Sequence, residues 1–159
     1  MSTNALATTQ IRPYLAVDRQ ACLAIFRSNL PRYFDSSELP EFDAFLEQAS
    51  GDYFVVEQGS AVVACGGCYI RDGKGRLSWG MVAREYYGDS IGAALLAWRV
   101  NTLFLQPGTA EITIDTSQHT AGFFARYGFR TTQQIRDGFG VGIDLIFMSL
   151  QRDDWQAGN

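Results

Sequence analysis

The chain has 159 residues, 47% of them hydrophobic and 19% charged, with a formal net charge of −4 at pH 7. These values are typical of one folded domain with its own core, and they exclude a disordered chain or one drawn by bulk charge to nucleic acid or anionic membranes. No apolar run approaches the roughly 20 residues of a membrane span, and residues 1–10 lack the basic and apolar regions of a signal peptide. We therefore expect a cytoplasmic protein with no nucleic-acid or membrane partner.

Three cysteines raise the question of a metal or redox site. Cys65-Gly66-Gly67-Cys68 has metal-ligand spacing, but a structural zinc site needs four ligands, and the single histidine, His119, lies far along the chain. The pair also lies in an apolar run, 61–70, that indicates a strand. We interpret Cys22, Cys65 and Cys68 as small buried thiols and expect no metal, with metal or redox use as the weaker alternative.

The first half of the chain predicts a strand, two helices and three strands. Asp18 is a candidate N-cap for the first helix, and Leu39, Phe42, Phe45 and Leu46 share one face of the second. Tight turns at 58–60 and 72–75 predict hairpins. The expected elements are a strand at 11–15, a helix from Asp18 to about 29, a short helix near 39–46, and strands at 53–57, 61–70 and 76–82.

The second half predicts helix, strand, helix and two strands. An amphipathic helix runs from Ile91 to about Leu105, and a strand follows near 112–114. Thr116 or Ser117 can cap the next helix and Gly128 can close it, before strands near 129–135 and 143–150. Hairpins mixed with crossover helices indicate an α/β (α+β) fold, a mixed sheet with helices on both faces, but they name no chemistry.

One strand-to-helix turn carries more information. The strand 77–82 leads into a turn of small residues that opens directly into a helix at Ile91, leaving backbone N–H groups at the positive end of the helix dipole. Such groups can hold a pyrophosphate, and Gly88 and Gly92 remove side chains that would block its approach. The alternative is that the glycines only shape the connection. The pattern is neither a dinucleotide-binding fingerprint nor a P-loop.

The segment Tyr87-Gly88-Asp89-Ser90-Ile91-Gly92 resembles the coenzyme-A-binding motif of the GNAT superfamily of N-acetyltransferases, Gln/Arg-x-x-Gly-x-Gly/Ala. The stretch from Ile112 to Phe129 resembles the family's later motif of strand, helix and terminal Gly-Phe. With flanking strands, the resemblance covers about residues 10–150. It implies a GNAT-like sheet, mixed and largely antiparallel, of about six to seven strands flanked by about four helices. It also implies one acyltransferase domain over 1–159, with short flexible tails near 1–9 and 152–159.

The resemblance further implies a reaction: acetyl-CoA as acyl-donor cosubstrate, and direct attack by an amine of a small molecule or peptide, without a covalent enzyme intermediate. A homodimer is an assembly common to such folds. A backbone N–H near Gly80 is the predicted oxyanion donor, since a glycine beside Trp79 suggests a bulge. The implied cofactor contacts are Met81, Val82, Tyr87, Gly88, Asp89, Ser90, Ile91, Gly92, Gln118 and Phe124.

The chain also departs from the family pattern. Tyr87 replaces a usual Gln or Arg, Ser90 replaces a usual Gly, and Phe124 stands where the family often has a Tyr acid. Tyr127, one helical turn on, is the substitute acid. Arg76 stands near the family's usual Glu base. The remaining base candidates are His119, Asp115, Glu85 and Glu57, with a water chain as the alternative.

Two further readings stay open at this point: a non-catalytic acyl-CoA sensor on the same fold, and a nucleotide or flavin binder on an unrelated α/β fold. The walls of the acceptor site are expected from the two early helices and the late strands. The candidate residues there are Arg27, Arg32, Tyr33, Phe34 and Asp35.

Overall fold

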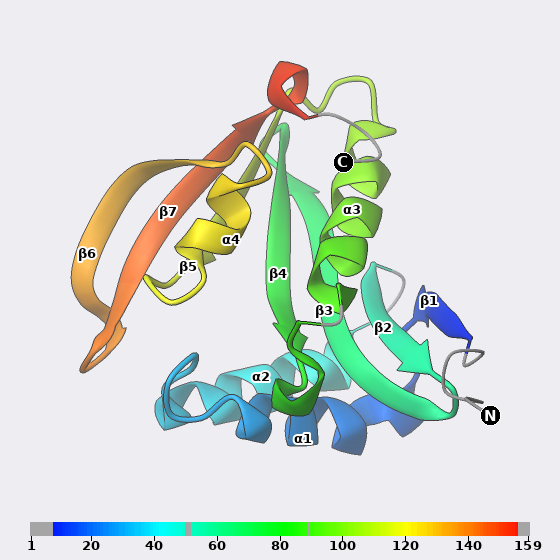
Figure 1. Ribbon diagram of the computed structural model, residues 1–159. Coiled ribbons are helices and arrows are strands. Elements are labelled where there is room, and N and C mark those ends of the chain that lie inside the picture. The colour runs from blue at the N-terminus through cyan, green and yellow to red at the C-terminus, as the bar shows by residue number, and fades with distance from the viewer. Residues whose placement is uncertain (1–7, 50–51, 89, 156–159) are drawn as a thin grey trace.

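Seven strands form one mixed sheet in the computed structural model, which describes residues 8–49, 52–88 and 90–155 (Figure 1). In order across the sheet, they are β1 (Thr9–Pro13), β2 (Tyr53–Gln58), β3 (Ala61–Arg71), β4 (Lys74–Val82), β5 (Glu111–Thr116), β7 (Ile143–Gln151) and β6 (Arg130–Gly140). Among these strands, only β4 and β5 pair in parallel. The predicted α/β (α+β) class with a largely antiparallel sheet is confirmed.

Four α-helices cover the two faces of this sheet: α1 (Arg19–Ser28), α2 (Leu39–Gln48), α3 (Ile91–Phe104) and α4 (Ala121–Ala125). Alternate side chains of β2 pack against helices on opposite faces of the sheet. Val55 packs with α1 and α2 through Phe26 and Phe42, whereas the neighbouring Phe54 and Val56 lie in the clusters formed with α3. Both faces of the central strands are therefore buried.

The sheet divides between β4 and β5. These strands pair at only two positions, Gly75 with Ile112 and Arg76 with Thr113. Beyond that point β4 continues beside β3 and β5 continues beside β7, so the two strands diverge (Figure 1). The divergence leaves space inside the sheet next to the start of α3 and next to α4.

A bulge interrupts β4 in the middle of its pairing with β3. Met81 pairs with Cys65 and Ser78 pairs with Gly67, so Trp79 and Gly80 together face one residue of β3. Trp79 has a positive φ of 43°, and its carbonyl accepts a hydrogen bond of 2.8 Å from the Tyr53 hydroxyl. The bulge predicted beside Gly80 is present.

Asp18 begins α1 by position but does not cap it through its side chain. Its carboxylate accepts hydrogen bonds of 2.8 Å from both terminal nitrogens of Arg12 and another of 2.8 Å from the Leu15 N–H. The Arg12 guanidinium is the largest cause that lowers the pKa of Asp18. Asp18 therefore joins β1 to α1.

Several predicted boundaries were wrong. The first strand lies at 9–13, and β6 continues to Gly140, which pairs with Ile143 of β7 beyond an irregularity that follows Ile135. Residues 152–154, which fall within the expected tail, form a 3₁₀ turn, and Arg152 donates hydrogen bonds to the carbonyls of Phe104, Gln106 and Thr109. Long-range pairing of this kind leaves no periodic signal in the sequence.

The cysteine pair does not form a joint site. Cys65 lies in the core with α1 and α2, while Cys68 lies in the core with α3, on the opposite face of β3. A hydrogen bond between Cys22 and Cys65, together with burial, raises the pKa of the Cys22 thiol. The described residues contain no group of three or more potential metal ligands. None of the described helices is long and apolar enough to span a bilayer.

Candidate active site

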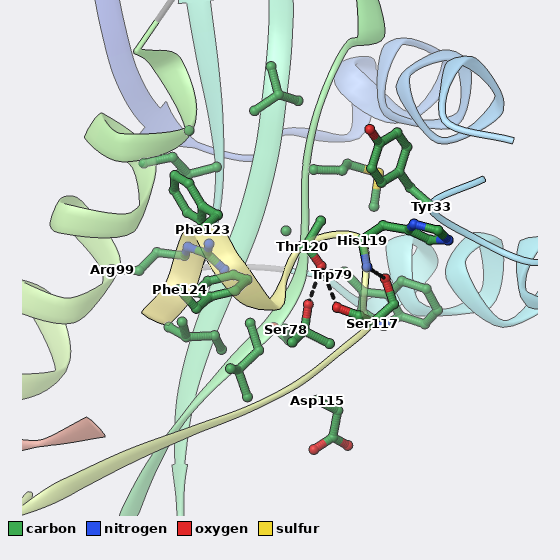
Figure 2. A pocket seen from close by; sticks show the side chains of 18 of the residues that line it. Tyr33, Ser78, Trp79, Arg99, Asp115, Ser117, His119, Thr120, Phe123 and Phe124 are labelled. Atoms are coloured by element: carbon green, nitrogen blue, oxygen red, sulfur yellow. Dashed lines mark hydrogen bonds between the residues drawn. The ribbon is translucent and has the colours of Figure 1, made fainter. Parts of the chain in front are cut away.

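A cavity of about 900 Å³ occupies the divergence between β4 and β5. It extends from the turn before α3, past the bulge of β4, to α4 and the first turn of α2. Figure 2 shows Tyr33, Ser117 and His119 on one side of this space and Arg99 and Phe123 on the other. Elements from both halves of the chain thus meet in one site.

The start of α3 directs backbone N–H groups toward this cavity. Ser90 precedes the helix with a left-handed φ of 65°, and its carbonyl accepts the N–H of Ala94. None of the described residues accepts a hydrogen bond from the N–H groups of Ile91, Gly92 or Ala93. These are the orphan donors that favour an anion at a helix N-terminus.

Glycines keep the approach to these donors open. Gly88 has a φ of 91°, and a Cβ added there would meet no described atom within 4 Å beyond its chain neighbours. At Gly92 an added Cβ would lie 3.6 Å from the Val82 side chain. The turn can therefore accept an anionic group, whose charge suits the helix dipole. Asp89, also predicted to bind the cofactor, lies outside the described residues.

Tyr87 connects this turn to α1. Its hydroxyl donates to Oδ1 of the buried Asn29, whose amide donates to the carbonyls of Ile25 at 2.9 Å and Val82 at 3.0 Å. Burial raises the pKa of Tyr87 to about 12, so the hydroxyl stays protonated at neutral pH. Tyr87 is 41% exposed as a whole residue, and it lines the cavity. Asn29 is a supporting residue that the sequence did not reveal.

Aromatic side chains of α4 line the opposite wall. The ring of Phe123 lies 5.1 Å from that of Phe124 and 5.3 Å from that of Tyr127, measured between centroids. Both Phe124 and Tyr127 border the cavity. Gly128 closes α4 with a φ of 102°, and the N–H of Phe129 bonds back to the carbonyl of Phe124.

This geometry has counterparts among known proteins. The family model described as acetyltransferase (GNAT) domain matches residues 49–131, more than half of the chain. The chain belongs to the GNAT acetyltransferase family. It is accordingly an acetyltransferase, a family whose acyl donor is acetyl-CoA. No curated protein gives a significant sequence match.

Solved structures agree with this assignment of the GNAT fold. The ribosomal-protein-S18-alanine N-acetyltransferase of Escherichia coli superposes with a TM-score of 0.72 at 19% identity, over 96% of this chain and 97% of that one. The ribosomal-protein-alanine N-acetyltransferase of Brucella melitensis gives 0.70 at 21% identity, over 89% and 99%. The PaiA N-acetyltransferase of Thermoplasma acidophilum, solved with coenzyme A, gives 0.69 at 16% identity, over 91% and 99%.

Only two of the four base candidates of this GNAT acetyltransferase reach the cavity. His119 lines it, with its ring centroid 5.9 Å from that of Tyr33, and Asp115 lines it on β5. Desolvation raises the pKa of Asp115, and Arg76 partly opposes that shift. Glu57 on β2 accepts a 3.0 Å hydrogen bond from Arg12 on β1, and Glu85 is exposed outside the cavity wall. Neither of those two side chains lines the cavity.

Three of the predicted cofactor contacts, Gln118, Ile91 and Met81, differ in how they lie relative to the cavity. Gln118 does not line the cavity, because its amide donates to the carbonyl of Gly142 at 2.8 Å and accepts the N–H of Asp144 at 2.8 Å. It fastens the turn between β6 and β7. The Ile91 side chain is buried in the core, so only its backbone N–H is available to a ligand. Met81 also packs into the core, although it borders the cavity.

The acceptor side contains residues that were not predicted. Tyr33 and Phe34 line the cavity as expected, whereas Arg27, Arg32 and Asp35 do not. Glu38 and Glu41 do line it, one helical turn apart at the start of α2. Burial raises the pKa of Glu38, whose carboxylate accepts the N–H of Asp35 at 2.9 Å. The Asp35-x-x-Glu38 capping box was the available sequence signal.

Proposed function

We propose that this protein is an N-acetyltransferase that moves the acetyl group of acetyl-CoA to an amine of a small molecule or peptide by direct attack. The observation that carries the proposal is a single cavity joining two features. At one end are the N–H groups at the start of α3, for which the described residues supply no acceptor, and midway along is the bulge of β4 at Gly80. An anion-binding end and an oxyanion donor within one cleft suit a thioester donor.

The predicted roles in the reaction follow from where the side chains lie. Acetyl-CoA supplies an activated acyl group when bound. A backbone N–H of the β4 bulge would stabilise the charge that develops on the carbonyl oxygen. His119 or Asp115, or water beside them, would take the proton from the acceptor ammonium. Tyr127 would donate a proton to the departing thiolate. Holding both reactants in one cleft supplies much of the rate enhancement.

We also propose that residues 1–159 form one acyltransferase domain. Every described strand belongs to the same sheet, and the cavity draws its walls from both halves of the chain. A division between any two consecutive strands of the chain would separate strands that are paired in this sheet.

The direct test is release of coenzyme A thiol from acetyl-CoA in the presence of an amine panel. The panel should hold amino acids, polyamines, aminoglycosides and peptides with a free N-terminus, since two structurally similar enzymes act on ribosomal-protein alanine. We expect acceptor-dependent thiol release and a monoacetylated product by mass spectrometry. Tight coenzyme A binding without turnover on any acceptor would contradict catalysis. Competition by NAD or ATP, but not by 3′-phospho-ADP, would contradict the cofactor.

A further inference from the structure

Arg99 is a buried cation without an anionic partner. It belongs to α3 and is only 4% exposed. Its one hydrogen bond is long, from Nη1 to the carbonyl of Gly67 at 3.4 Å, and Nε has no partner within the part of the chain that the structure describes. The described residues include no carboxylate in an ion pair with it.

Glycines make room for this guanidinium against the β4 bulge. A Cβ added at Gly80 would lie 2.8 Å from both Nη1 and Nη2 of Arg99, and one added at Gly66 would lie 3.2 Å from its Cζ. The guanidinium therefore lies directly against the backbone of Gly80. That residue is also the predicted oxyanion donor, so the charge is placed at the reacting end of the cleft.

Arg99 borders the cavity, and Figure 2 shows its side chain extending from α3 toward the middle of the site. It follows Ile91 by eight residues, which corresponds to about 12 Å along the helix axis. The N–H groups proposed to bind the diphosphate therefore lie well away from the guanidinium. Any anion that contacts Arg99 must be a second acidic group, separate from the diphosphate.

Leaving such a charge unpaired is unfavourable in the folded protein. A buried cation without a counter-ion loses its hydration and gains no ion pair in return. Desolvation lowers the pKa of Arg99 to about 10, so the guanidinium remains charged at neutral pH. Apolar neighbours in the wall, Leu77, Leu95 and Phe124, keep the local polarity low. A carboxylate matches the planar fork of a guanidinium in two parallel hydrogen bonds.

We propose that Arg99 binds a carboxylate of a substrate at the inner end of this cleft. This inference rests on the proposed function, because it takes the cleft to hold an acyl-CoA and an amine. The carboxylate has two sources: the distal acid of a dicarboxylic acyl group on coenzyme A, or the carboxylate of an amino-acid acceptor. Either would pair the buried charge only in the loaded enzyme.

The experiment compares the wild-type protein with Arg99→Met, which keeps the length of the side chain without its charge, and with Arg99→Lys. Calorimetry gives the affinities for coenzyme A, acetyl-CoA and succinyl-CoA, and kinetics give KM for amino acids against their amides. In the wild type we expect a difference of about tenfold or more in one of two comparisons: succinyl-CoA against acetyl-CoA, or free amino acids against their amides. The ligand with the carboxylate should bind more tightly, by the factor expected from a charge-assisted hydrogen-bonded ion pair. The Met variant loses that preference and the Lys variant keeps part of it.

The two arms identify the source: preference for succinyl-CoA assigns the acyl group, and preference for the free amino acid assigns the acceptor. Unchanged coenzyme A affinity in Arg99→Met shows that the variant is folded. Equal affinities for acid and neutral ligands in the wild type would overturn the proposal, as would a preference that survives in Arg99→Met.

If wild-type protein does not bind coenzyme A, the proposed function has failed, and Arg99 is then tested with free succinate. Thermal stabilisation of the wild type but not of Arg99→Met supports the carboxylate site on its own. Equal or absent stabilisation overturns it.

Discussion

Gly88 and Ser90 show what single residues contribute to the turn before α3. Both have positive φ values, 91° and 65°, and together they set the direction in which the chain enters the helix. For Ser90 this conformation costs about 1 kcal/mol relative to glycine. The chain keeps a serine there, although glycine adopts this conformation without that cost.

Substitution of Gly88 by tryptophan should abolish coenzyme A binding, because the indole would fill the open space in front of the α3 amides. Calorimetric titration checks this. Gly88→Ala is the matched control, since it carries the same backbone strain with little bulk and should bind within about tenfold of the wild type. Equal affinity in Gly88→Trp would place the diphosphate elsewhere.

Tyr127→Phe tests the predicted acid. If the hydroxyl protonates the thiolate, kcat should fall by about tenfold or more while coenzyme A affinity changes little. Tyr14→Phe is the control, because Tyr14 lies in the α1 and α2 core, outside the cavity wall. Turnover at the wild-type rate in Tyr127→Phe would show that the thiolate leaves unassisted.

At the scale of elements, local signals in the sequence were sufficient for much of the fold. Gly59 and Gly73, both with positive φ, stand in the hairpin turns that were predicted, and Gly80 in the predicted bulge. Contacts between distant segments were not accessible. Gln118 reaches Gly142, and Glu57 reaches Arg12, through a pairing of strands that no local pattern encodes.

Arg99 was only partly predictable from the sequence. It lies on the face of α3 that also carries Leu95, Leu96 and Val100, all buried. A charged residue within an apolar helical stripe was visible in the sequence as an exception. What it contacts was not visible, because the glycines that accommodate it belong to β3 and β4.

The junction of β1 with α1 predicts a pH-dependent stability. Arg12 lowers the pKa of Asp18 in the folded state below its ordinary value of 3.8. The ionised Asp18 carboxylate therefore contributes its full stabilisation above pH 3.8, and this stabilisation is lost as the pH falls through the folded-state pKa. Asp18→Asn should lower the free energy of unfolding by about 2 kcal/mol at pH 7, and the difference should shrink below about pH 4. Denaturant titrations at both pH values measure it.

A matched variant distinguishes the loss of the buried Asp18 ion pair from the loss of an ion pair at the protein surface. Asp43 pairs with Arg19 at 2.6 Å between partly exposed side chains, so Asp43→Asn should cost much less than Asp18→Asn. A loss in Asp18→Asn that is no larger than in Asp43→Asn, or that persists at low pH, would contradict the role of the buried carboxylate.

For the molecule as a whole, ligand binding and stability are linked. Coenzyme A at one hundred times its Kd should add about 2.7 kcal/mol to the free energy of unfolding, and so raise Tm by roughly 5–10 °C for a chain of this size. Thermal melts across a concentration series check the dependence. Gly88→Trp should show no shift, and a shift of equal size there would mean that the ligand binds outside the cavity.

The two-position junction of β4 with β5 has a mechanical consequence. Among the described residues, strands β1–β4 and β5–β7 are paired only at Gly75 with Ile112 and at Arg76 with Thr113, and the core cluster formed with α3 contains residues of both groups. A long, flexible molecule bound between these two groups of strands would contact both of them. A ligand between β4 and β5 would then restrict movement of the two groups of strands relative to each other while the two reactants are aligned.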